Sequence, residues 1–331
     1  MVGIPRGLLF YRFYWLWKTF LEELGVEVRV SPPTNKAIIR RGLTYGVEEI
    51  CFPVKVFLGH VMAIQDEVDF LFLPRMVSFH RREYTCPKIL GLPDLVRNLF
   101  GISSERIITG EVNMRDTGIW GWRQGFLEMG RRFTRQEGKI MRALKRAEEA
   151  HKRYREKLKT GILPEHLIDR REEVVPKEKK VLLLGHTYLI SDSYINMNIV
   201  QKIHTLGYGV VTQDMVDEQR VRKYLSLLQK PSFWTISNEI MGTALLYLKE
   251  RDPRLKGYIH LVSFECGPDS LVGEVIERWI KRESETLPYL RLEIDEHTGE
   301  AGLLTRLEAF VDMMEWRDAH LESNLSSSLA P

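Results

Sequence analysis

The sequence predicts an α/β protein of two doubly wound parallel-sheet domains, joined by a basic helical connector and ending in a C-terminal helix. Short apolar runs typical of strands alternate with longer segments of helical periodicity. This alternation occurs before residue 115 and again after residue 177. The length of 331 residues is enough for two such domains.

The first domain is predicted to span residues 1–115. Its elements follow a β-α-β-α-β order, which favours a parallel sheet. Gly25 fits the end of the first helix, and Pro53 fits the first turn of the second. The predicted elements are strand 2–5, helix 8–24, strand 26–30, helix 53–65 and strand 68–74.

The second domain is predicted to span residues 177–322 and repeats this design without residue-level repetition. A disordered tail is expected at 323–331, which is rich in serine. The predicted strands are 179–185, 208–212, 257–264 and 288–294, and the predicted helices are 194–206, 217–229, 236–250, 270–281 and 303–321.

The connector, residues 116–176, overlaps the most basic part of the chain. Residues 131–180 contain 17 Lys+Arg against 9 Asp+Glu, a local net charge of +8. The segment is rich in good helix formers, so we expect a solvated helical connector. The alternative is a docking surface for an acidic partner.

Charge and hydropathy exclude several classes of protein. The net charge is +3, from 48 Lys+Arg and 45 Asp+Glu, which does not favour a nucleic-acid binder or a polybasic membrane protein. No apolar run approaches the roughly 20 residues of a transmembrane helix. Three cysteines cannot form a fully paired disulfide scaffold, so we expect a cytoplasmic protein with free or metal-bound thiols.

The three cysteines share one local context. Cys51, Cys86 and Cys266 are each followed within two positions by a proline, and then by a segment that can be helical. Proline is favoured in the first helical turn, so each thiol is predicted to lie just before a helix N-terminus. The unpaired N–H groups there favour a thiolate. Lys55 and Lys88 lie within a turn and could add positive charge.

The predicted strand ends suggest that the cysteines meet. Cys266 follows a strand directly, and ligands of open α/β sheets bind beyond the carboxyl ends of strands. We therefore expect the thiols to converge in a cleft between the domains. Three thiolates suit zinc with a fourth His, or an iron–sulfur cubane with one open iron. The alternative is that they are small buried core residues.

Two histidines are candidates for additional ligands. His60 lies in a mostly apolar helix, where a hydrogen-bonded core histidine is the favoured interpretation, although it is a candidate fourth ligand for zinc. His186 follows a predicted strand and could face the cleft. Neither a GxGxxG fingerprint nor a GxxxxGK[ST] phosphate loop is present in the sequence.

The segment 295–302, DEHTGEAG, gathers Asp295, Glu296, His297 and Glu300 after a strand. A hard-metal or acid–base cluster is one interpretation. Capping of the last helix by Asp295 or Thr298 is the favoured one, because consecutive residues point in different directions.

Taken together, the motifs resemble those of a known family. They are GIPRGLLFYRFYWLWKTFLEELGVEV, SPPTNK, CFPVKVFLGH, YTCPKILGLPD, FECGPDS and LEIDEHTGEAGLLTRLEAF. The chain is similar to the acyl-CoA dehydratase activase-related proteins, relatives of the 2-hydroxyacyl-CoA dehydratase subunits and the double-cubane cluster proteins. The resemblance spans roughly residues 3–115 and 180–313.

The resemblance implies a 4Fe-4S cubane, or a double cubane shared in a homodimer, held by Cys51, Cys86 and Cys266. It also implies a separate actin-like ATPase as activase and electron donor. The leading hypothesis is therefore an iron–sulfur protein of anaerobic metabolism for low-potential electron transfer or small-substrate reduction, as an ATP-dependent reductase or dehydratase-like component. The alternatives are a zinc-stabilised or metal-free interaction module for an ATPase or acyl-CoA enzyme, and a plain α/β ligand-binding protein.

Overall fold

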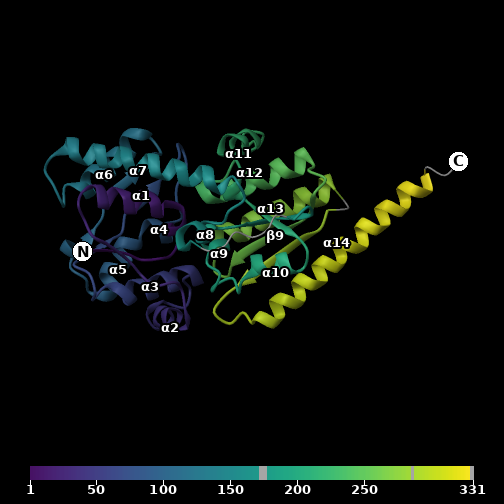
Figure 1. Ribbon diagram of the computed structural model, residues 1–331, viewed down its shortest axis with the longest axis horizontal. Coiled ribbons are helices and arrows are strands. Elements are labelled where there is room, and N and C mark those ends of the chain that lie inside the picture. Colours follow the sequence, from purple (N-terminus) through teal and green to yellow (C-terminus); the bar gives the residue numbers. More distant parts are fainter. Residues whose placement is uncertain (171–176, 285–286, 329–331) are drawn as a thin grey trace.

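The computed structural model describes residues 1–170, 177–284 and 287–328, with the backbone alone for 321–328. It confirms the predicted α/β class with parallel sheets. The two four-stranded sheets lie side by side along the long axis of the molecule, and α14 extends beyond the body (Figure 1). The domain boundaries themselves stay a prediction, because one continuous buried core includes residues of both sheets.

Both four-stranded sheets have the same strand order. The N-terminal sheet runs β2-β1-β3-β5 and the C-terminal sheet β10-β9-β7-β8, and all their pairings are parallel. Counted within each half, both orders read 2-1-3-4. The order therefore reverses between β1 and β3 and between β7 and β9, where doubly wound folds bind ligands.

The strands are short in the first half and longer in the second. A further parallel pair, β4 with β6, extends the first half and was not predicted. The strands are β1 (Val2–Ile4), β2 (Val28–Val30), β3 (Phe70–Phe72), β4 (Arg75–Ser78), β5 (Ile107–Ile108), β6 (Glu111–Asn113), β7 (Lys180–Gly185), β8 (Gly209–Thr212), β9 (Leu255–Ser263) and β10 (Tyr289–Ile294).

Helices cover the faces of both sheets. The helices are α1 (Phe10–Glu23), α2 (Lys36–Tyr45), α3 (Phe52–Ile64), α4 (Pro87–Leu90), α5 (Leu92–Phe100), α6 (Ile119–Gly130), α7 (Glu137–Leu158), α8 (Pro164–Asp169), α9 (Thr187–Ser191), α10 (Ile199–Thr205), α11 (Glu218–Leu225), α12 (Thr235–Glu250), α13 (Gly267–Glu283) and α14 (Glu300–Ser328). None of these described helices combines the length and the apolar character that crossing a membrane requires.

Two helix predictions need correction. The helix predicted at 194–206 begins at Ile199, because Met197 and Asn198 adopt left-handed backbone angles (φ 55° and 57°) that no α-helix accommodates. The tail predicted as disordered at 323–331 is helical as far as Ser328, and 329–331 lie outside the described residues. No Gly or Pro interrupts the sequence from Leu303 to Ala330, so the last helix can propagate.

The connector is more than the solvated segment that its charge predicts. α7 packs along α1 and buries a stripe at helical spacing, which includes Ile140, Leu144 and Ala147. α8 contacts the N-terminal half through Asp169, whose two carboxylate oxygens accept hydrogen bonds from Arg6 at 2.6 and 2.7 Å. Most charged residues of α7 are exposed, whereas Glu148 and Arg155 are half-buried and bond to Trp122 and Asp214.

Two glycines bring α2 and α3 into backbone contact. A Cβ atom at Gly42 would lie 1.9 Å from the carbonyl oxygen of Lys55, and one at Gly59 would lie 2.0 Å from that of Ile38. Only hydrogen fits at either position. Because α3 begins directly after Cys51, this close packing also fixes where that cysteine lies.

Buried ion pairs connect the two halves. Arg12 of α1 donates two hydrogen bonds to Glu239 of α12, at 2.7 and 2.8 Å. Lys55 of α3 donates to Glu296, which follows β10, at 2.5 Å. Burial opposes ionisation of Glu239, but Arg12 and His80 outweigh it, so the pKa of Glu239 lies well below its usual value.

Replacing Gly59 with Ala should lower the free energy of unfolding by about 2 kcal/mol, because the two helices must separate to admit the methyl group. Urea unfolding followed by circular dichroism measures this change. Gly302→Ala is the control, since a Cβ there meets no atom within 4 Å, and it should be neutral or slightly stabilising. Equal effects of the two substitutions would contradict the close packing of α2 and α3.

Replacing Glu239 with Gln should cost about 3 kcal/mol near pH 7, because it leaves the Arg12 guanidinium buried without its counter-ion. The lowered pKa of Glu239 means that its contribution is complete above its unfolded pKa of 4.5 and is lost as pH falls below that value. The stability difference from the wild type should therefore shrink in acid. Glu308→Gln, on the exposed side of α14, should show no loss at pH 7.

Candidate functional site

All three cysteines line one cavity at the junction of the two halves. The cavity has a volume of about 330 Å³ and is bounded by residues from both halves, including Tyr188 and Trp234. The three cysteines are free, with no disulfide among them. The predicted convergence in a cleft is therefore what the structure shows, whereas a ligand role for the cysteines stays a prediction.

Each cysteine is the residue immediately before a helix. Cys51 precedes α3, Cys86 precedes α4 and Cys266 precedes α13, and each helix has proline in its first turn. The prediction of three helix-start cysteines is thus confirmed. Proline is favoured there because its missing N–H is one that a helix start leaves unpaired anyway.

The topology explains why the second half contributes two groups to the cavity. Cys266 follows the end of β9 by three residues, and His186 follows β7 directly. These strands are neighbours at the point where the strand order reverses. Both side chains therefore emerge into the crevice in which doubly wound sheets bind ligands.

Two of the three thiols, those of Cys51 and Cys86, do not carry the predicted ease of ionisation. Burial raises the pKa of Cys51 to about 11, although the nearby Lys88 charge lowers it. Burial also raises the pKa of Cys86, against backbone hydrogen bonds that lower it. The cost of removing a thiolate from water exceeds the stabilisation from the helix starts. In the metal-free chain Cys51 and Cys86 are therefore neutral near pH 7.

A histidine and an aspartate accompany Cys266. His186 Nε2 lies 3.7 Å from the Cys266 sulfur and 3.2 Å from a carboxylate oxygen of Asp269. Burial disfavours a charged ring, but Asp269 and Cys266 outweigh it, and the pKa of His186 lies well above its usual value. The expectation that His186 faces the cleft is confirmed.

Asp269 was missed by the sequence analysis. It is fully buried in the first turn of α13, three residues after Cys266. The motif CGPD carried the signal, because a carboxylate in the first turn of a helix returns toward the residue that precedes it.

His60 is not part of the cavity wall. Its two ring nitrogens each lie 2.9 Å from a hydroxyl, that of Ser31 and that of Thr34. The favoured interpretation of a hydrogen-bonded core histidine is confirmed, and the alternative as a ligand beside the cysteines is wrong. Burial lowers the pKa of His60 to about 3, so the ring is neutral.

Of the two lysines, one reaches the site. Lys88 lines the cavity and donates to the carbonyl oxygens of Glu49 and Glu265, at 3.2 and 3.1 Å. It therefore also joins the two halves at the cavity mouth. Lys55 instead pairs with Glu296, so its charge is already compensated.

The segment 295–302 forms a turn before the last helix. The side chains of Asp295 and Thr298 bond within that turn rather than to the first N–H groups of α14, so the favoured capping role is not what the structure shows. The side chain of Asp295 accepts hydrogen bonds from His297 N and from Thr298 Oγ1, at 2.9 and 2.7 Å, and Thr298 Oγ1 accepts one from Asp295 N. Glu296 is used in the ion pair with Lys55. These contacts form a turn that leads into α14.

Of the possible metal-ligand atoms in the cavity, those around Cys266 lie close together and the three sulfurs lie farther apart. Among the described residues, the atoms of His186, Cys266 and Asp269 lie within 4.8 Å of one another, and the three cysteine sulfurs do not form such a group. Gly267 lines the same cavity, and a Cβ there would meet no atom within 4 Å. The cavity therefore has open space beside Gly267.

Comparison with known proteins identifies a family for most of the chain. A family model described as the CoA enzyme activase uncharacterised domain matches residues 1–216. The match includes Cys51, Cys86 and His186, and it runs across the connector, which the motif resemblance left out. No curated protein matches the chain.

Proposed function

The chain belongs to the CoA enzyme activase uncharacterised domain family, and from this premise we propose that it is an iron–sulfur protein. In this proposal Cys51, Cys86 and Cys266 hold a 4Fe-4S cubane, or a double cubane shared in a homodimer. The observation that carries the proposal is that three sulfurs, remote in sequence, line one cavity.

The spacing of the sulfurs supports a group larger than a single ion. Thiolates around one tetrahedral zinc lie about 3.8 Å apart, as follows from a Zn–S bond of about 2.3 Å. The three sulfurs are not within 4.8 Å of one another as a set. A cubane has its irons at separate corners, so three thiolates can bind it without meeting at a point.

The surroundings of the cavity suit an anionic group. Each cysteine lies at the N-terminal end of a helix, where backbone N–H groups are unpaired and the helix dipole is positive. Lys88 adds a positive charge to the cavity wall. Tyr188, Trp234 and Ile236 form an apolar part of the wall that limits access of water. When bound, the cluster would supply low-potential electrons and one iron that is free to bind a substrate.

The partner in this proposal is a separate ATP-hydrolysing activase of the actin-like type, which delivers the electrons. The description of the family as a CoA enzyme activase domain supports an association with such a system. The chain would act in the cytoplasm as an ATP-dependent reductase or dehydratase-like component.

Replacing any one of the three cysteines with Ser should remove most of the iron from protein purified without oxygen, because each thiolate occupies one corner of the cluster. Iron and acid-labile sulfide per chain are measured after purification. Ser237→Ala is the control, since it removes a buried hydroxyl from the same cavity wall and leaves the thiols intact. Full iron in all three cysteine variants would contradict the proposal.

A zinc-stabilised module is a second candidate, and a separate observation favours it. His186 Nε2 lies 3.7 Å from the Cys266 sulfur and 3.2 Å from a carboxylate oxygen of Asp269. The edges of a tetrahedral zinc site with such ligands are about 3.3–3.8 Å. In this case the metal would require His186 and Asp269 but not Cys51 or Cys86.

The two candidates differ in which substitution, His186→Ala or Cys51→Ser, removes the metal. For a mononuclear site, this substitution should abolish zinc binding, while Cys51→Ser should leave about one zinc per chain. For the cluster, Cys51→Ser should be the damaging change. Metal analysis of the two variants side by side decides between the candidates.

A further inference from the structure

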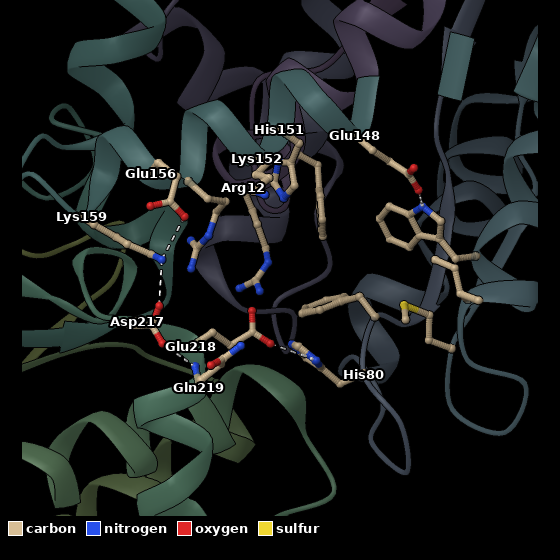
Figure 2. A pocket seen from close by; sticks show the side chains of 16 residues that line it. Arg12, His80, Glu148, His151, Lys152, Glu156, Lys159, Asp217, Glu218 and Gln219 are labelled. Atoms are coloured by element: carbon tan, nitrogen blue, oxygen red, sulfur yellow. Dashed lines mark hydrogen bonds and ion pairs between the residues drawn. The ribbon is translucent and has the colours of Figure 1, made fainter. Parts of the chain in front are cut away.

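A second cavity of about 500 Å³ lies on another part of the junction between the halves. α1 and α7 form one side of it, and the start of α11 lies opposite (Figure 2). It shares no lining residue with the cysteine cavity. The volume is in the range of pockets that bind small molecules.

One end of this cavity is an aromatic wall. The ring of Phe13 lies at its centre, 5.5 Å from His151, 5.5 Å from Phe79 and 6.1 Å from Trp122 between centroids. Burial, together with Arg155 and Arg12, lowers the pKa of His151 to about 3. The imidazole is therefore neutral near pH 7 and acts as a fourth aromatic surface.

Two guanidinium groups line the cavity with their carboxylate partners outside the wall. Arg12 is paired with Glu239 and Arg155 with Asp214, and neither carboxylate is among the lining residues. The Arg155 pair therefore presents its positive end to the cavity, whereas Arg12 also faces the lining carboxylate of Glu218. Figure 2 shows the Arg12 guanidinium directed into the space, toward the carboxylate of Glu218.

The carboxylates that do line the cavity are already engaged. Glu156 and Asp217 both accept from Lys159, at 3.0 and 2.8 Å. Glu148 accepts from Trp122 Nε1 at 3.0 Å, and Glu218 lies 3.4 Å from a ring nitrogen of His80. Each of these carboxylates therefore already has a nitrogen of the protein beside it.

Polar side chains of α7 offer groups to a ligand. Within the part of the chain that the structure describes, Lys152 has no ion pair or hydrogen bond through its side chain, and His151 Nδ1 has no hydrogen-bond partner. Arg155 donates from a single nitrogen, to Asp214. A ligand with acceptors on this side and a planar ring against the aromatic wall would complement Lys152, Arg155 and Phe13.

We propose that this cavity binds a small aromatic anion, with its ring against Phe13 and Trp122 and its charged group near Lys152 and Arg155. The site is independent of the proposed iron–sulfur function, because the two cavities have no lining residue in common. An aryl carboxylate and a nucleoside monophosphate both carry this chemistry.

Isothermal titration calorimetry with matched probes tests the ligand class. Indole-3-acetate or AMP should bind, and whichever of them binds identifies the carboxylate or the phosphate form. Tryptamine, which has the indole ring with a cationic chain, and acetate, which has no ring, should bind at least tenfold more weakly. The proposal would be overturned if tryptamine bound as tightly as indole-3-acetate. It would also be overturned if neither anion bound at millimolar concentration.

Two matched variants locate the binding. Lys152→Gln should weaken binding of the anion about fivefold, the effect of losing one partly exposed charge contact. Lys145→Gln removes the same charge two turns earlier on α7, outside the cavity, and should leave affinity unchanged. An equal loss of affinity in both variants would contradict the proposal, because it would mean that the positive charge of α7 attracts anions without a specific binding site. Cys51→Ser should retain the binding, whatever its effect on metal content.

Discussion

The buried ion pair between Arg12 and Glu239 is the contact on which the geometry of the junction depends. It holds α1 of one half against α12 of the other, and α12 begins directly after Trp234. Trp234 forms a β-bridge with Tyr84, two residues before Cys86. The Arg12–Glu239 ion pair therefore fixes the segments that line the cysteine cavity from both sides. Phe79 and His80, which precede Tyr84 in the same segment, line the second cavity.

Burial decides the chemistry of the cysteine cavity. A helix start favours a thiolate, but the two resolved thiol pKa values rise because the sulfurs have left water. An electron-poor metal centre reverses that balance, since it compensates the thiolate charge at the sulfur itself. In the proposed cluster site, the thiols of Cys51 and Cys86 would thus ionise when the metal group binds and stay neutral without it.

Local patterns predicted the parts of the site that depend on neighbouring residues. A cysteine followed by proline and a helical segment predicted all three helix starts, and strand ends predicted the convergence of Cys266 and His186. The β4–β6 pair could not be predicted because its two strands are remote in sequence. The α2–α3 contact could not be predicted because it depends on two glycines whose role only the packing reveals. The partners in the buried ion pairs could not be predicted either, because no sequence spacing links Arg12 to Glu239.

The most direct test of the central claim is the content of iron, zinc and acid-labile sulfide in the wild-type chain purified without oxygen. The account predicts about four irons per chain with comparable sulfide. Zinc near one per chain, or no metal in protein folded with iron and sulfide available, would contradict it.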